Sequence, residues 1–262
     1  MLKKLIDEFL KTGADEKLFE YLTSNSNLPG PRGNLELAAS FANTLNEYRG
    51  AAVDKLWEFC LKMTAISAEE APVNTPDEFI PFCGTVGIGS IAAAHAGYFS
   101  DALSRLRELA NDPRWRMREA VAMGLQRLIT ANAAAVLSDL KKWVAGSKLL
   151  ELRAVAAAVA EPALLKDSEV AKVAFHLNQQ IIEKLIEADD RKSENFRVLR
   201  KALGYTLSVV IVPLPEEGFK YLSQLVKMND PNVNWVIKEN LKKNRLIKNY
   251  PDKVASLKNL LN

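Results

Sequence analysis

The sequence predicts an all-α protein built from a row of antiparallel helix pairs. Apolar residues recur at spacings of three and four along most of the 262 residues, which is the period of a helix with one buried face. The alternation typical of β-strands is nearly absent, and the breaks between helical stretches are a few residues long. Helices joined by such short breaks pack as hairpins. We therefore expect about twelve or thirteen helices, making about six hairpins, in one domain over residues 1–262.

The first hundred residues contain two long irregular stretches. Helical spacing covers residues 2–10, 18–22, 35–48 and 53–63. Residues 25–34 hold two prolines and two glycines and are predicted to form a loop, with Asn34 as the N-cap of the next helix. The prolines between Pro72 and Pro81 mark the second stretch, which is either an insertion loop or a linker that subdivides the chain near 67–80. We expect helices to resume at about Thr85.

Two ambiguous segments in the rest of the chain are interpreted as helical. The β-branched run 207–212 has no evident partner strand, so it is expected to be the buried end of a helix that starts near Ser193. Gly84, Gly87 and Gly89 do not form a phosphate-binding loop, because no Lys-Ser or Lys-Thr pair follows them. These glycines are attributed to close packing between helices.

The sequence lacks the patterns of most enzyme and membrane classes. No apolar run approaches the roughly 20 residues of a membrane-spanning helix, and the N-terminus does not resemble a signal peptide. We expect a cytoplasmic protein with no membrane partner. Cys60 and Cys83 lie among apolar residues and are expected to be buried, reduced thiols. His95 and His176 have neither metal-ligand nor triad spacing, so we expect no metal, no cofactor and no catalytic residues.

One internal pattern is more specific than helical periodicity. From Asp112 the chain reads Asp-Pro-Arg-Trp-Arg-Met-Arg-Glu-Ala-Val-Ala-Met-Gly-Leu, with Arg118 six residues after the Asp-Pro turn. Weaker copies place Arg153 and Arg200 in the same slot, and Asp230 begins a further Asp-Pro copy. This pattern resembles the HEAT-repeat signature, most clearly over residues 100–246. The resemblance implies a right-handed, curved α-solenoid whose concave face is lined by the second helix of each pair.

Charge is unevenly distributed along the chain. Residues 1–100 carry 8 basic and 13 acidic side chains, whereas residues 101–262 carry 27 basic and 19 acidic ones. A basic second half favours an acidic partner, although a solvated lysine-rich surface gives the same composition. Basic residues beside tryptophan are also what phosphate neutralisation and base stacking require. The candidate binding residues are Arg114, Trp115, Arg116, Arg118, Arg153, Arg200, Trp235, Lys238, Lys242 and Arg245.

The repeated arginines have two interpretations. Arg118, Arg153 and Arg200 could form a cationic ladder on the concave face. The resemblance also implies a structural ladder, in which each arginine pairs with a carboxylate such as Asp112 or hydrogen-bonds a helix end.

Two functions are consistent with these patterns. The first is a non-catalytic scaffold or adaptor that binds a macromolecular partner, most naturally a protein, on its concave face. The second is a DNA-binding protein, because the segments around Trp115 and Trp235 look like HEAT-like-repeat alkylpurine DNA glycosylases, which place tryptophans and an acidic residue in a basic groove. That resemblance adds Trp143 as a third tryptophan, with Asp112 or Asp139 as the acid.

Overall fold

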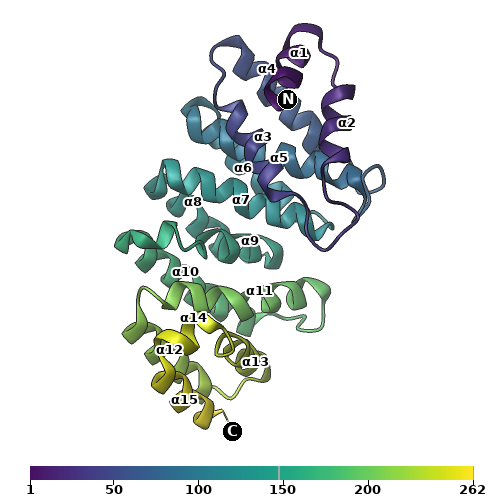
Figure 1. The fold of residues 1–262 in the computed structure, drawn as a ribbon. Coiled ribbons are helices and arrows are strands. Elements are labelled where there is room, and N and C mark those ends of the chain that lie inside the picture. The colour runs from purple at the N-terminus through teal and green to yellow at the C-terminus, as the bar shows by residue number, and fades with distance from the viewer. Residues whose placement is uncertain (147, 262) are drawn as a thin grey trace. The chain divides into compact units, whose positions relative to one another are not determined.

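The structure is a computed structural model that describes residues 1–146 and 148–261. Its described residues form helices, turns and loops, with no strand among them, which confirms the all-α prediction. The chain divides into two compact units, Met1–Asn132 and Ala133–Asn262, and each is described by itself (Figure 1). The stretch near 67–80, considered as a possible subdivision, lies inside unit 1. None of the helices in the described ranges is long and apolar enough to cross a membrane.

Unit 1 contains seven α-helices and two 3₁₀ turns within the range described. Their bounds are α1 Leu2–Thr12, α2 Glu16–Ser24, α3 Leu35–Leu45, α4 Ala51–Thr64, η1 Pro76–Glu78, α5 Phe79–Ala94, η2 Ala96–Tyr98, α6 Phe99–Leu109 and α7 Trp115–Ala131.

Unit 2 contains eight α-helices and one 3₁₀ turn, counted over its described residues. Their bounds are α8 Ala133–Ala145, α9 Leu149–Val159, η3 Leu164–Lys166, α10 Ser168–Glu187, α11 Glu194–Ile211, α12 Pro215–Lys227, α13 Pro231–Asn240, α14 Asn244–Asn249 and α15 Pro251–Leu260.

Helix α5 is the core of unit 1. Every residue from Phe79 to Ala92 is buried, and the helix packs on α3, α4 and α7. A Cβ atom at Gly89 would collide with the backbone of Gly124 in α7, and one at Gly84 would collide with the Met63 side chain in α4. The glycines therefore let three helices approach closely, as the sequence predicted.

The predicted start of this helix was wrong by six residues. Helix α5 begins at Phe79, whereas the sequence analysis kept the chain irregular up to Thr85. Pro81 is the third residue of the helix, where a backbone N–H would have no partner within the helix, so proline is tolerated there. The stretch is apolar on all sides, which left no amphipathic stripe to mark its beginning.

Helix α11 is the centre of unit 2. It packs on α9, α10 and α13, and it continues through Val209 and Val210 to Ile211, which confirms the helical interpretation of the β-branched run. The buried Asn240 of α13 donates to the Leu203 carbonyl and accepts from the Ser208 amide of α11. This side chain fixes the register of α13 against α11, because a one-residue slip would leave buried polar groups unpaired.

Each unit pairs helices that are two apart in sequence. In unit 1, α5 packs on α7; in unit 2, α9 packs on α11, α11 on α13, and α8 on α10. Consecutive helices such as α10 and α11 also pack together across a short connection, which makes them helical hairpins. This pattern of contacts is typical of stacked hairpins.

The N-cap predicted at Asn34 is confirmed, whereas the Asp-Pro turns at Asp112 and Asp230 differ from each other. The Asn34 side chain accepts from the Leu37 amide, and Asp230 caps α13 by accepting two amides. Helix α7 starts only at Trp115, so Asp112 lies three residues before it and caps no amide of the helix. Its carboxylate instead accepts from the Arg114 amide at 2.7 Å.

Candidate functional site

Arg114 anchors a loop of unit 1. Its side chain is 2% exposed, and its guanidinium pairs with the Asp112 carboxylate at 2.7 Å. The same guanidinium donates to the backbone carbonyls of Ile66, Ser67 and Ala71. Arg114 therefore closes the loop after α4 onto the start of α7. It is a structural residue in this geometry and offers solvent almost no surface.

Arg116 anchors a second loop in the same way. Its guanidinium pairs with the carboxylate of Glu78 at 3.0 Å, and both side chains are buried. It also donates to the Gly30 carbonyl and to Asn74 Oδ1. The guanidinium lies 4.3 Å from the ring centroid of Trp115, whose side chain is 44% exposed. One arginine thus joins the 25–34 loop, the segment before α5 and the start of α7.

The remaining arginines of this hairpin are held by their own unit. Arg118 is buried and donates to the carbonyls of Asp112 and Pro113 just before α7. Arg105 donates to the Thr64 hydroxyl of α4, and Arg127 donates to Asn43 Oδ1 of α3. At Arg118 the geometry matches the structural interpretation of the repeated arginine, a side chain that holds a helix end. The buried arginines of unit 1 are therefore poor candidates for contact with a large anion.

The other cluster of candidates lies on unit 2. Arg200 of α11 is half-buried, donates to Asn232 Oδ1 at 2.6 Å and lies over the ring of Trp235 at 4.7 Å from its centroid. Gly204, one turn after Arg200, faces the same ring, and a Cβ there would come within 3.0 Å of it. The small glycine therefore admits Trp235 against α11, and this contact brings predicted residues of α11 and α13 together.

A second cation–aromatic contact extends the cluster. Tyr205 is 45% exposed on α11. The Arg245 guanidinium lies 4.6 Å from its ring centroid and donates to the Tyr205 hydroxyl at 2.9 Å. The Lys243 ammonium lies 5.8 Å from the same ring. These contacts place the start of α14 beside α11.

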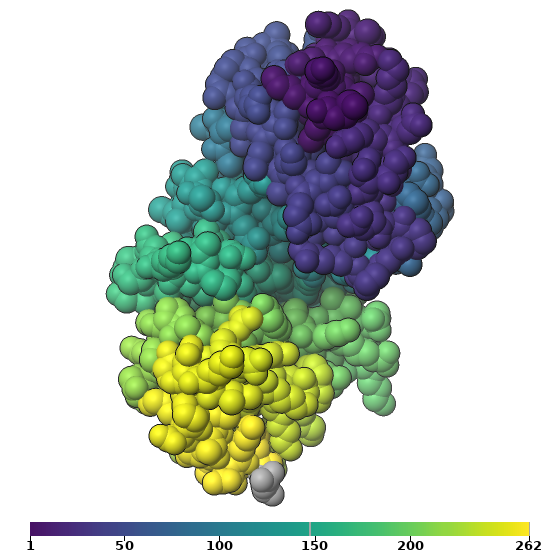
Figure 2. Space-filling view, in the orientation of Figure 1, coloured from purple at the N-terminus to yellow at the C-terminus, as the bar shows by residue number. Residues whose placement is uncertain are grey.

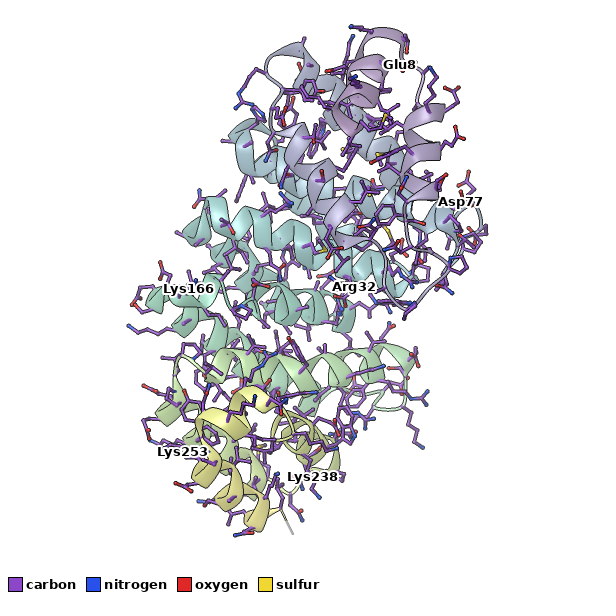
Figure 3. The ribbon with its side chains drawn as sticks, in the orientation of Figure 1. Glu8, Arg32, Asp77, Lys166, Lys238 and Lys253 are labelled. Atoms are coloured by element: carbon purple, nitrogen blue, oxygen red, sulfur yellow. The ribbon has the colours of Figure 1, made fainter. Side chains whose placement is uncertain are left out.

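Exposed basic residues lie on α11, on α13 and just after α13. Arg197, Lys201 and Tyr205 recur every four residues on α11 and are all exposed, so they lie on one side of the helix. Lys238 is exposed on α13, one turn after Trp235, and Lys242 pairs with Glu239 at 2.5 Å. Figure 3 shows Lys238 on the opposite side of unit 2 from Lys166 and Lys253. In the space-filling view, the yellow C-terminal residues lie directly on the green helices that precede them (Figure 2).

We call this surface the basic face. It consists of Arg197, Arg200, Lys201, Tyr205, Trp235, Lys238, Lys242, Lys243 and Arg245. Two carboxylates lie within it, Glu194 paired with Arg197 and Glu239 paired with Lys242. Seven basic side chains against two acids leave a strong local excess of positive charge, which attracts anionic partners.

The N-terminus of α13 is stabilised by a partly buried ion pair. Arg191 donates to the Asp230 carboxylate at 2.6 Å, while the amides of Asn232 and Val233 bond its other oxygen. Burial alone would raise the pKa of Asp230, but the hydrogen bond from Arg191 and the two amides lower it below the ordinary value. The carboxylate therefore stays ionised and holds the start of α13, which carries Trp235.

Five of the ten predicted residues thus belong to the basic face. These are Arg200, Trp235, Lys238, Lys242 and Arg245. Arg114, Trp115, Arg116 and Arg118 belong to unit 1, and Arg153 is buried in α9. The sequence analysis missed Tyr205, Lys201, Arg197 and Lys243. The four-residue spacing from Arg197 to Tyr205 could have revealed the first three, but this helix was considered mainly for its buried side.

The residues predicted from the glycosylase resemblance are buried or already paired with other side chains. Trp143 is 3% exposed in α8, so its ring cannot stack on a base. Asp112 is occupied by Arg114, and Asp139 pairs with Lys142 at 2.6 Å. Cys60 and Cys83 are free and buried, as predicted. No group of three potential metal ligands gathers within the ranges that the structure covers.

A shallow groove also lies on unit 1. It has a volume of about 700 Å³ between α1 and α4, and its lining includes the tilted ring pair of Phe9 and Phe59, whose centroids are 4.1 Å apart. Lys62 on its rim is already paired with Asp15 at 2.6 Å. The groove therefore has less uncompensated charge than the basic face.

Comparison of the chain with protein-family models, with curated proteins and with solved structures finds no match.

Proposed function

We propose that this chain is a non-catalytic HEAT-like scaffold or adaptor, which binds a macromolecular partner through the basic face. In this proposal the helix pairs stack into a right-handed superhelix, and its concave surface is lined by the second helix of each pair.

The proposal is supported by which helices form the basic face. Helices α11 and α13 follow α10 and α12, with which they pack, so both are second helices of a pair. They carry the exposed Lys201 and Lys238, and the contact between Arg200 and Trp235 joins the two helices. A surface made by neighbouring second helices, rather than by a single loop, suits a partner that makes many modest contacts.

The superhelix can be tested by small-angle X-ray scattering. A compact 262-residue protein has a radius of gyration of about 18 Å. A superhelix of stacked hairpins is elongated and should exceed this value clearly. A value at or below the compact one would contradict this part of the proposal.

The binding face can be tested by site-specific photo-crosslinking. Benzoylphenylalanine would replace Lys238 on the basic face, or Lys166 of η3 as the matched exposed control, and both proteins would be irradiated in an extract of the native cells. The proposal expects a discrete protein adduct only from position 238, and its loss when Lys201 is changed to Glu. The same adducts from both positions, or none from position 238, would contradict it.

DNA binding remains the second candidate, because the basic face combines cations with Trp235 and Tyr205. It predicts binding of labelled duplex DNA that weakens steeply with salt, since each phosphate contact releases counterions. Fluorescence polarisation at low and at physiological salt tests this directly. Lack of binding at low salt would remove the candidate, and release of methylated purines would separate a glycosylase from a passive binder.

A further inference from the structure

The basic face has cations that no carboxylate neutralises. Arg200, Lys201, Lys238, Lys243 and Arg245 have no acidic partner in the described part of the chain. Lys201 and Lys238 are also exposed. Some lysines elsewhere on unit 2 are paired, as Lys172 is with Glu169 and Lys253 with Glu216. Uncompensated cations on neighbouring helices raise the local concentration of anionic ligands.

One surface of each aromatic ring of this face already contacts a guanidinium. The Arg200 guanidinium lies over Trp235, and the Arg245 guanidinium lies over Tyr205 while bonding its hydroxyl. A nucleic-acid base that stacked on these ring surfaces would have to displace a cation–π contact of about 0.5–1 kcal/mol or more. The rings and their hydrogen-bond partners hold the two guanidiniums in place, so that their positive charge is fixed on this face before an anion binds.

The size of the face favours a short ligand. Arg197 and Tyr205 are eight residues apart on α11, which is about 12 Å at the rise of an α-helix. An extended peptide covers this distance with about four residues. One strand of duplex DNA would present only three or four phosphates over the same length, whereas non-specific DNA binders usually use a longer track of contacts.

We infer that the basic face binds an extended acidic segment, rich in Asp or Glu, of a partner protein. Carboxylates of the segment contact the exposed ammonium groups of Lys201 and Lys238, and the guanidiniums of Arg200 and Arg245 add to the positive charge of the face. The geometry that carries this inference is the combination of unpaired cations, rings that each already hold a guanidinium, and the short length of the face along α11. The inference rests on the proposed function, because it names the chemistry of the partner at the same surface.

The inference is tested with two probes of similar length and charge. A fluorescein-labelled peptide of about eight glutamates, twice the length that the face spans, is compared with a labelled oligothymidylate of equal length by fluorescence anisotropy at low salt. We expect the full chain to bind the peptide at least about fivefold more tightly, because the unpaired cations match carboxylates while a base stacking on the same ring surfaces would have to displace a guanidinium. Equal or tighter binding of the oligonucleotide would overturn the inference.

Matched variants locate the binding. The variant Lys201→Glu/Lys238→Glu reverses two charges on the basic face, and Lys166→Glu/Lys220→Glu reverses two exposed charges elsewhere on unit 2. We expect the first to weaken peptide binding by about tenfold or more through like-charge repulsion and the second by less than about twofold. Thermal melting followed by circular dichroism checks that both fold. Equal losses in the two variants would overturn the inference.

The outcomes separate this inference from the proposed function. If the oligonucleotide binds more tightly and the face variant abolishes that binding, the acidic-segment inference fails while the basic face remains a binding surface. If neither probe binds, and photo-crosslinking from position 238 yields no adduct, both fail. Tight, face-dependent binding of the peptide supports both.

Discussion

The buried pair between Arg116 and Glu78 gives the sharpest test of how unit 1 is held together. Glu78 has no exposed surface, and its Oε2 accepts from Arg116 at 3.0 Å and from the Asn74 amide at 2.8 Å. Replacing Arg116 with Met leaves a buried carboxylate without its counter-ion, and replacing Glu78 with Gln leaves a buried guanidinium. Breaking a buried pair from one side costs about 3–5 kcal/mol.

The double variant should recover part of this loss. Arg116→Met together with Glu78→Gln removes both charges at once, so neither is left unpaired. Side chains in direct contact usually show coupling of about 0.5–3 kcal/mol, and full burial places this pair toward the upper end. We therefore expect the double variant to be about 2–3 kcal/mol more stable than the sum of the two single changes predicts. The lost bonds to Gly30 and Asn74 should keep it below the wild type.

Urea denaturation followed by far-UV circular dichroism measures these differences through the linear dependence of unfolding free energy on urea. The control is Arg32→Met, which breaks the exposed Arg32–Glu36 pair at 3.3 Å and should change stability by less than about 0.5 kcal/mol. Single changes that each cost under about 1 kcal/mol, or a double variant that is simply additive, would refute the structural role assigned to Arg116.

Three further predictions follow from local geometry. Gly89→Ala should destabilise the protein by about 1–3 kcal/mol because its methyl group meets the backbone of α7, whereas Gly97→Ala, with open space around it, should be nearly neutral by thermal melting. Burial raises the pKa of the thiols of Cys60 and Cys83, so a thiol reagent at pH 8 should label them only upon unfolding; rapid labelling of the native chain would contradict their burial. The folded-state pKa of Asp230 lies below its ordinary value of 3.8, so its ionised form adds stability above about pH 4 that is lost as the pH falls through the folded value. Asp230→Asn should therefore lose less stability than the wild type on acidification from pH 5 to 3, and parallel losses would contradict the shift.

Periodicity predicted most of the helices because their burial is one-sided. Helix α1, for example, has Leu2 and Ile6 buried on one side and charged residues on the other. The start of α5 was not predicted because the helix is buried on all sides and contains a proline near its N-terminus. Local pattern carries no boundary signal in such a segment.

The arginines show where sequence proximity misleads. Arg114 and Arg116 are close together in a basic stretch, yet apart from Asp112 their hydrogen-bond partners lie 38 to 86 residues away in loops that fold back onto α7. A sequence window around α7 does not contain these carbonyls and carboxylates, so the same residues could equally have been a ligand-binding cluster. Only the packing of the loops identifies them as structural.

On unit 2 the sequence predicted Lys238, Lys242 and Arg245 as binding residues. The structure ends α13 at Asn240 and places Arg245 in α14, against Tyr205, so the three residues do not follow one helix. The contact between Arg200 and Trp235 crosses 35 residues and depends on Gly204 admitting the indole ring. Neither helix alone predicts that two helices form one face.

The chain contains four tryptophans, and their indole N–H signals in a ¹H–¹⁵N NMR spectrum allow the basic face to be tested directly. Only Trp235 belongs to the basic face, while Trp57, Trp115 and Trp143 lie elsewhere in the fold. On titration with the glutamate peptide, the Trp235 signal should shift in a saturable manner while the other three stay in place. A shift confined to Trp115, or no shift of Trp235 at saturation, would contradict binding at the basic face.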